Sequence, residues 1–166
     1  MKISCPFDDQ ILPDLYTKAS DVKVAEKPVV SFPFIIEEAP ENTKTFAWTF
    51  VDYDSIPVCG FTFIHWVVAN VPASNALILE DFARVDENHV HGKNSLASPF
   101  FRGAYTSIDE WYTGPCPPDE DHLYTLTVYA LDCELPVKDG FYLNNLRREM
   151  AGHVLAKADI ELVGRC

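Results

Sequence analysis

The sequence has few basic residues and no long hydrophobic run. Lysine and arginine together number 13 against 25 aspartates and glutamates, which gives a formal net charge of −12 at pH 7. Because nucleic acids are bound through basic surfaces, this deficit argues against a nucleic-acid partner, and it equally disfavours attachment to anionic membranes. The longest apolar stretches have the length of a strand, so we also expect no stable membrane insertion.

Paired cysteine motifs are also missing. The chain has an odd number of cysteines, widely spaced and without a CxxC pair: Cys5, Cys59, Cys116, Cys133 and Cys166. This pattern predicts reduced thiols, with neither a disulfide framework nor a zinc–cysteine site. The first nine residues contain no hydrophobic segment of signal-peptide length, and we therefore expect a cytoplasmic protein.

The chain shows no internal repeat, low-complexity tract or linker, so we expect a single domain over residues 1–166. Residues 45–51, 61–70 and 123–131 are rich in β-branched and aromatic side chains, which predicts strands. Residues 28–36 also read as a strand, placed at an edge or a bulge because Pro33 cannot donate to a ladder. Residues 87–113 lack periodicity, and an irregular stretch of this length usually shapes a binding site or an interface.

The C-terminal part changes character. Leu143, Leu146, Met150 and Val154 recur at helical spacing, and further alanines up to Ala158 support a helix. The apolar run at 160–163 then predicts a return to the sheet as a strand.

A proline-rich loop precedes one of the predicted strands. Three prolines and a glycine within Gly114–Pro118 exclude a helix, and the prolines cannot donate hydrogen bonds to the neighbours of a central strand. In the strand that follows, alternation puts His122 and Tyr124 on the same face as Leu126. A histidine and a phenol at the mouth of an apolar strand face predict the wall of a small polar pocket.

Two further polar residues lie in or next to predicted strands. Asp52 continues the apolar face of its strand at the point where that strand ends. His65 lies in a strand that is apolar on both faces, as is typical of a central strand, and strict alternation places it with Val67 and Ala69, opposite Trp66. A buried histidine needs a hydrogen-bond partner, and we expect Asp52 to provide it.

The order of these motifs resembles the phosphatidylethanolamine-binding protein family, in its bacterial branch of Raf kinase inhibitor-like proteins. The motifs are Asp52-x-Asp54 with a proline nearby, His65 in an aromatic-rich strand, Tyr112-x-Gly-Pro-Cys-Pro-Pro118, His122-x-Tyr124 and the terminal segment Gly152–Ala158. The resemblance extends from about Asn42 to the C-terminus. Tyr53 stands where the family usually has a proline, and Leu123 stands where it often has an arginine.

The resemblance implies a mainly β fold, in which a large antiparallel sheet packs on a smaller sheet and a helix lies near the C-terminus. It also implies a small anion-binding pocket at one end of the large sheet. Carried over position by position, the ligand-binding residues would be Asp52, Asp54, His65, Gly114, Pro115, His122 and Tyr124.

The function implied is non-catalytic binding of a small anionic or phosphorylated ligand, extended to modulation of a partner protein such as a kinase; the resemblance also makes a homodimer plausible. A histidine held by a carboxylate keeps one tautomer, and when protonated it donates to a phosphate oxygen. Two alternatives stay open: a hydrolase using Asp52, His65, His122 and Tyr124 as acid–base groups, and an interaction module with a vestigial pocket.

Catalytic residues and cofactors are not expected, because the sequence has no nucleophile elbow and no zincin motif. Cys116 is the one thiol that would change this expectation, by pairing with His122 as a thiolate. His89 and His91 share a strand face and would hold a metal if a third ligand approached. Without such a ligand a solvated loop is the better interpretation, and no metal site is predicted.

Overall fold

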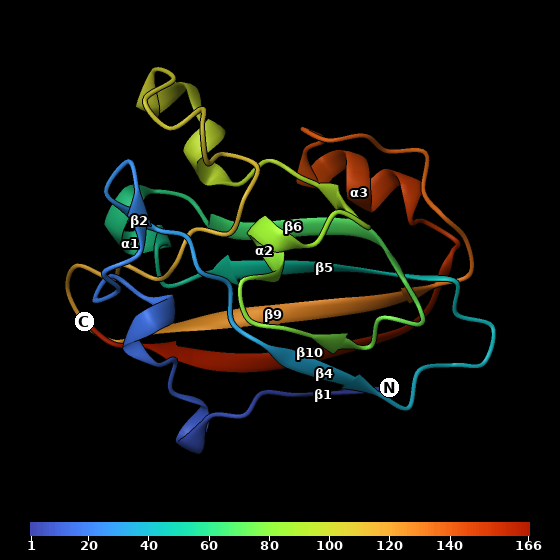
Figure 1. The fold of residues 1–166 in the computed structure, drawn as a ribbon. Helices are drawn as coiled ribbons and strands as arrows, with labels where there is room; N and C mark the ends of the chain where they lie inside the picture. The colour runs from blue at the N-terminus through green and yellow to red at the C-terminus, as the bar shows by residue number, and fades with distance from the viewer.

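The structure, a computed structural model of residues 1–166, is built around a five-stranded antiparallel sheet with the order β10-β9-β5-β6-β8 (Figure 1). Its strands are β5 (Thr45–Asp52), β6 (Phe63–Pro72), β8 (Val90–His91), β9 (His122–Leu131) and β10 (Val154–Gly164). The three longer strands predicted from β-branched and aromatic runs are therefore confirmed, and they lie side by side at the centre of the sheet.

A smaller sheet covers one face of the large one. It consists of β1 (Lys2–Ser4), β4 (Phe34–Glu37) and β7 (Leu77–Ile78), while β2 (Lys23–Val24) and β3 (Lys27–Pro28) form a separate two-stranded ribbon. In Figure 1, β1 and β4 run side by side next to β10. The predicted packing of a large antiparallel sheet on a smaller one is confirmed.

The main core fills the space between these two sheets. Its 21 buried residues include aromatic rings from both sides, such as Phe34 from the small sheet and Trp48 from β5, whose centroids are 5.3 Å apart in an edge-to-face arrangement. Trp48 continues the contact to Trp66 on β6 at 5.2 Å. Edge-to-face pairs at such distances stabilise a core beyond the burial of their area.

A second, smaller core lies on the opposite face of the large sheet. It joins Ala47, Val67 and Leu131 to Leu146 of the helix α3 (Leu143–Glu149). The remaining helices are one turn long: α1 (Ile56–Cys59), α2 (Phe82–Val85) and 3-10 turns at Asp8–Gln10, Asp14–Tyr16, Ser95–Ala97 and Pro99–Phe101. None of the helices has the length and apolar character that crossing a membrane requires.

The C-terminal helix is shorter than the sequence suggested. It ends at Glu149, a turn with Gly152 at φ 86° follows, and β10 already begins at Val154. The prediction of helix up to Ala158 was wrong because alanine spacing was weighed above alternation. From Ala156 to Leu162 the more buried residues recur at every second position, which is the period of a strand.

The predicted strand at 28–36 is divided by its irregular middle. β3 ends at Pro28 and β4 begins at Phe34, directly after Pro33. Between them, the buried Ser31 bonds to the beginning of α2: its carbonyl accepts from the Asp81 amide at 2.8 Å, and its hydroxyl accepts from the Ala83 amide at 3.0 Å. The segment 87–113 is irregular as expected, apart from β8 and the two short 3-10 turns within it.

The pairing of β5 with β6 contains a register shift near Asn70. Phe46 pairs with Val71 and Trp48 with Val68, so β6 carries an extra residue there. Asn70 adopts a left-handed conformation with φ 60°, and its buried amide makes two bonds to the Leu135 backbone, donating to the carbonyl at 2.9 Å and accepting from the N–H at 2.8 Å. Asparagine tolerates this conformation better than other non-glycine residues.

We predict that Asn70→Ala lowers the free energy of unfolding by about 2–3 kcal/mol, because it strains a left-handed position and leaves two backbone groups of Leu135 without partners. Asn70→Gly should cost less, because it loses the bonds but relieves the backbone strain. Guanidinium unfolding measures both, with the exposed Asn144→Ala in α3 as the control, expected within about 0.5 kcal/mol of wild type. Equal effects of Asn70→Ala and Asn144→Ala would contradict this account.

Candidate functional site

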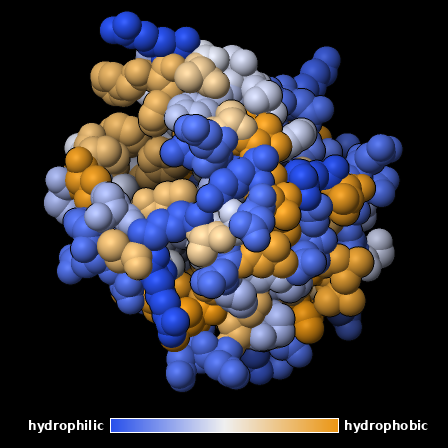
Figure 2. Space-filling view, turned by 60° about the vertical axis from the view of Figure 1, so that its left-hand side comes forward, coloured by the Kyte–Doolittle hydropathy of each residue, from blue (hydrophilic) through white to orange (hydrophobic).

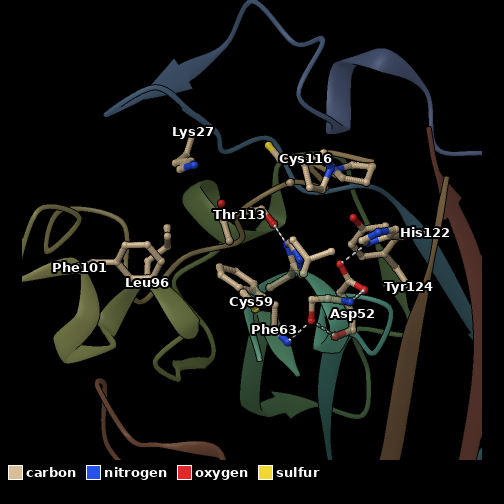
Figure 3. Close-up of a pocket in the computed structure, with 16 residues that line it drawn as sticks. Lys27, Asp52, Cys59, Phe63, Leu96, Phe101, Thr113, Cys116, His122 and Tyr124 are labelled. Atoms are coloured by element: carbon tan, nitrogen blue, oxygen red, sulfur yellow. Dashed lines mark hydrogen bonds and ion pairs between the residues drawn. The ribbon is translucent and has the colours of Figure 1, made fainter. Parts of the chain in front are cut away.

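A cavity of about 180 Å³ opens at the end of the large sheet where β5 ends and β6 and β9 begin (Figure 3). Because neighbouring strands are antiparallel, these three ends meet at the same edge. Of the seven residues predicted as ligand-binding, five line the cavity: Asp52, His65, Gly114, His122 and Tyr124. Figure 2, which brings this end of the molecule forward, shows apolar side chains gathered around a hollow.

His65 reaches the cavity through a β-bulge. Phe50 pairs with Trp66 and Val51 pairs with Ile64, which leaves His65 as the extra residue on β6. Its ring contacts Phe50 at 5.9 Å and Tyr124 at 5.1 Å between centroids, so it shares the core face with Trp66. The expectation that His65 lies opposite Trp66 was therefore wrong, because strict alternation does not hold across a bulge.

The partner of His65 also differs from the expected one. Its Nδ1 lies 2.7 Å from the Thr113 carbonyl, and since a carbonyl only accepts, Nδ1 carries the hydrogen. Burial lowers the pKa of His65 to about 4, although the Thr113 bond opposes this shift. His65 is thus a neutral imidazole whose Nε2 remains an acceptor.

Asp52 pairs with His122 instead. It is buried, 4% exposed, and its Oδ2 lies 2.9 Å from His122 Nδ1 while its Oδ1 accepts from the Ser55 amide at 3.0 Å. The other ring nitrogen of His122, Nε2, lies 3.0 Å from Asp119 Oδ1. Carboxylates on both sides fit a doubly protonated ring, in which both nitrogens donate.

The electrostatics of His122 agree with this geometry. Burial by itself lowers the pKa of His122, but the bonds and charges of Asp52 and Asp119 outweigh it, and the net shift is upward. Tyr124 sits opposite Asp52 in the β5–β9 register, and burial, with the Asp52 charge second, raises the pKa of its hydroxyl. The cavity therefore combines a histidine whose charged form is stabilised, a neutral histidine and a neutral phenol.

Two of the predicted residues do not line the cavity. Asp54 is exposed, and its Oδ2 accepts from the Leu123 amide at 2.8 Å, which ties the end of β5 to the beginning of β9. Pro115 is buried behind the wall, with its carbonyl accepting from the Lys18 amide at 2.8 Å. Both residues support the loops around the cavity and do not face it.

Gly114 lines the cavity, but its neighbours explain why it is glycine. A Cβ at this position would lie 2.3 Å from the Tyr16 carbonyl oxygen and 2.8 Å from the Pro28 ring. The Gly114 amide also donates to the Pro28 carbonyl at 2.9 Å. Close approach of the N-terminal segment therefore requires the missing side chain.

Sequence reasoning missed several residues of the wall, the most informative being Lys27. This lysine of β3 brings the only lysine or arginine side chain to the cavity, and its Nζ also lies 5.5 Å from the Tyr105 ring centroid. Phe63, Phe101 and Thr113 complete other parts of the wall (Figure 3). Lys27 belongs to no motif, and its strand is brought here by tertiary contacts such as the bond from the Gly114 amide to the Pro28 carbonyl.

The other candidates of the sequence lie outside this arrangement. The His89 and His91 rings are 4.3 Å apart, and His89 Nδ1 is held by Asp86 at 3.1 Å. The group of three potential metal-ligating side chains within 4.8 Å of one another lies elsewhere, at Asp132, Cys133 and His153. Cys116 is at the cavity mouth, and burial raises the pKa of its thiol, although three lysines oppose the shift.

Comparison with known proteins gives a consistent result. The family model of the phosphatidylethanolamine-binding protein matches residues 3–164. The chain is 46% identical over 157 residues to the uncharacterized protein YxkA of Bacillus subtilis, covering 93% of this chain and 94% of that one. A UPF0098 protein of Aquifex aeolicus is 36% identical over 127 residues, covering 75% and 67% of the two chains.

Solved structures agree at the level of the fold. CT736 of Chlamydia trachomatis, described as a phosphatidylethanolamine-binding protein homologue, superposes with a TM-score of 0.80 at 23% identity, covering 99% and 97% of the two chains. YbcL of Escherichia coli, described as a member of the mammalian family of that name, has a TM-score of 0.77 at 23% identity, covering 99% and 98%.

We predict that the two histidines of the cavity titrate on opposite sides of the ordinary histidine pKa of about 6.5. His122 should remain protonated above that value, whereas His65 should stay neutral until about pH 4. Long-range 1H–15N spectra across pH measure this, with His65→Gln and His122→Gln assigning the signals. Two superimposable titration curves near pH 6.5 would contradict the arrangement.

The same shift predicts how acid affects stability. Between about pH 6.5 and 4 the unfolded chain protonates His65 while the folded chain does not, so the free energy of unfolding falls as pH falls through this window. Unfolding at several pH values should show a shallower dependence in His65→Gln than in wild type. An unchanged slope would mean that His65 is already charged in the folded protein.

Proposed function

The chain belongs to the phosphatidylethanolamine-binding protein family, and we propose that its cavity binds a small phosphorylated or otherwise anionic group without turning it over. The observation that carries the proposal is the His122 ring, which lines the cavity and is 2% exposed, with its Nδ1 on the buried Asp52. A charged histidine fixed in this way is a donor of defined direction, and charge-assisted hydrogen bonds to phosphate oxygens are among the stronger ones.

The size and chemistry of the wall favour a compact group. A cavity of about 180 Å³ is smaller than the pockets of roughly 300–1,000 Å³ that hold drug-sized ligands. Lys27 supplies a cation and Tyr124 a neutral hydroxyl donor, while Nε2 of the neutral His65 can accept. A phosphate ester that keeps one O–H, or a headgroup with an N–H, would accept hydrogen bonds from these donors and donate one to His65 Nε2.

Hydrolysis is less well supported by the side chains around the cavity. Ser55 Oγ is occupied, because it lies within hydrogen-bond distance of the Asp52 and Phe61 carbonyls and accepts from the Phe63 amide at 2.9 Å. Both nitrogens of His122 face carboxylates, which favours the protonated ring, and in that form the ring has no lone pair with which to act as a base. The raised pKa of Cys116 keeps its thiol protonated.

Partners beyond the small ligand follow from the family resemblance alone. We propose a cytoplasmic protein that modulates a partner protein, a kinase being the example set by Raf kinase inhibitor-like relatives, and that is able to form a homodimer. Size-exclusion chromatography with light scattering measures the last of these directly.

We predict that sulfate binding weakens as pH rises above about 6.5. Sulfate keeps its charge over this range, so a change in affinity reports a change in the protein. Because the pKa of His122 is raised, its ring stays protonated below that pKa and loses its positive charge above it. Titration calorimetry at several pH values measures the affinity. A flat profile from pH 5.5 to 9 would remove His122 as the donor.

Variants identify the histidine responsible. His122→Gln should weaken sulfate binding about tenfold or more at pH 6, because a hydrogen bond from a charged donor is lost. His153→Gln is the matched control, since this histidine also pairs with an aspartate, Asp132 at 2.8 Å, but lies outside the cavity and is half exposed. Equal losses in the two variants would point to a general charge effect.

Cys116 provides the test of the catalytic alternative. Because its thiol is protonated at neutral pH, we expect slow labelling by iodoacetamide and no turnover of carboxylic or phosphoric esters. Rates compared between wild type and Cys116→Ser measure this. Turnover that disappears in Cys116→Ser would instead assign the protein to the enzymes.

A further inference from the structure

The two carboxylates that hold His122 differ in how firmly they are placed. Asp52 ends β5, is buried, and is fixed at its other oxygen by the Ser55 amide. Asp119 lies in the loop before β9, and its side chain is 53% exposed. The two bonds to the ring are nearly equal in length, at 2.9 and 3.0 Å, so the difference between the partners lies in their surroundings.

Nε2 is the nitrogen that a ligand would need. Nδ1 is committed to Asp52 inside the protein, so the only other N–H of the ring is the one that Asp119 accepts from. With His122 charged, the group of Asp52, His122 and Asp119 has a net charge of −1, which does not attract an anion. An anion that bonds to His122 must therefore take the place of the Asp119 carboxylate.

We propose that Asp119 is an internal competitor, whose carboxylate occupies the anion position on His122 until a ligand displaces it. The inference rests on the proposed function, because it concerns the same histidine, His122, which lines the cavity and bonds to Asp119. Displacement is eased on the Asp119 side, because this carboxylate is already half exposed and moves into water when it leaves the ring.

The neighbouring acidic residues do not share this role. Asp121 is held elsewhere, because its Oδ1 accepts from the Cys166 amide at 2.8 Å. Glu120 is exposed and makes no side-chain hydrogen bond, so it contributes charge but does not occupy the ring. Glu120 is thus a natural control for Asp119: a carboxylate in the same loop that does not contact His122.

The competitor also sets which anions bind. A carboxylate ligand would only exchange one singly charged carboxylate for another, with little gain. A phosphate has more acceptor oxygens than a carboxylate, so it can bond to His122 and still accept from a second donor of the cavity wall. Asp119 thereby favours phosphate groups, whether free or on an ester, over carboxylates.

The experiment compares inorganic phosphate and acetate on wild type, Asp119→Ala and Glu120→Ala, by calorimetry at pH 6. We expect Asp119→Ala to bind phosphate about fivefold more tightly than wild type, and Glu120→Ala to stay within about twofold. Acetate should bind Asp119→Ala alone, because it replaces the missing side chain. Far-UV circular dichroism and thermal unfolding check that the variants fold.

The outcomes separate this inference from the proposed function. Phosphate binding to wild type with equal affinity in Asp119→Ala, and no acetate binding, overturns the competitor and leaves the binding function in place. Phosphate binding to Asp119→Ala but not to wild type supports the competitor and overturns phosphate binding as the function of the natural chain. Absence of phosphate binding in all three proteins overturns both.

Discussion

The pocket depends on a carboxylate, that of Asp52, which is buried where β5 ends. A buried charge is costly unless it is paired and hydrogen-bonded, and Asp52 meets this requirement with Ser55 on one oxygen and His122 on the other. The Ser55 hydroxyl in turn bonds to the backbone of Phe61 and Phe63, at the beginning of β6. Removing this carboxylate would release the loop between β5 and β6 and the histidine at the beginning of β9 together.

The register of the sheet brings the remaining groups to this point. Asp52 pairs directly with Tyr124 across β5 and β9, so the register of these strands places the phenol and the carboxylate at the same end of the sheet. His65 arrives only because β6 has one residue more than β5 at this level. Bulges recur next to binding sites because they redirect a side chain without disturbing the rest of the strand.

The sequence was informative wherever local pattern decides the structure. Runs of β-branched and aromatic residues located β5, β6 and β9, and alternation correctly placed His122 and Tyr124 on the same buried face of β9. The bulge at His65 depends on how β5 and β6 are aligned with each other, and this alignment cannot be read from the sequence of either strand alone. Lys27 was missed for a similar reason, since the ribbon of β2 and β3 reaches the cavity through the bond between Gly114 and Pro28, far apart in the chain. The choice of Thr113 as the partner of His65 follows from the same loop packing.

The two departures from the family pattern fall on positions that face outward. Tyr53 follows Asp52 and is 56% exposed, and Leu123 lies between His122 and Tyr124 and is 45% exposed. At Leu123 alternation requires this, because His122 and Tyr124 on either side line the cavity, whereas Tyr53 follows the last residue of β5. An arginine at position 123 would therefore lie outside the cavity wall, and its replacement by leucine leaves the positive charge of the wall, that of Lys27, unchanged. The loop that leads to His122 is acidic, with Asp119, Glu120 and Asp121 in succession. These carboxylates lie next to His122 in the chain, so the one that reaches the ring, Asp119, balances part of the positive charge that Asp52 stabilises on it.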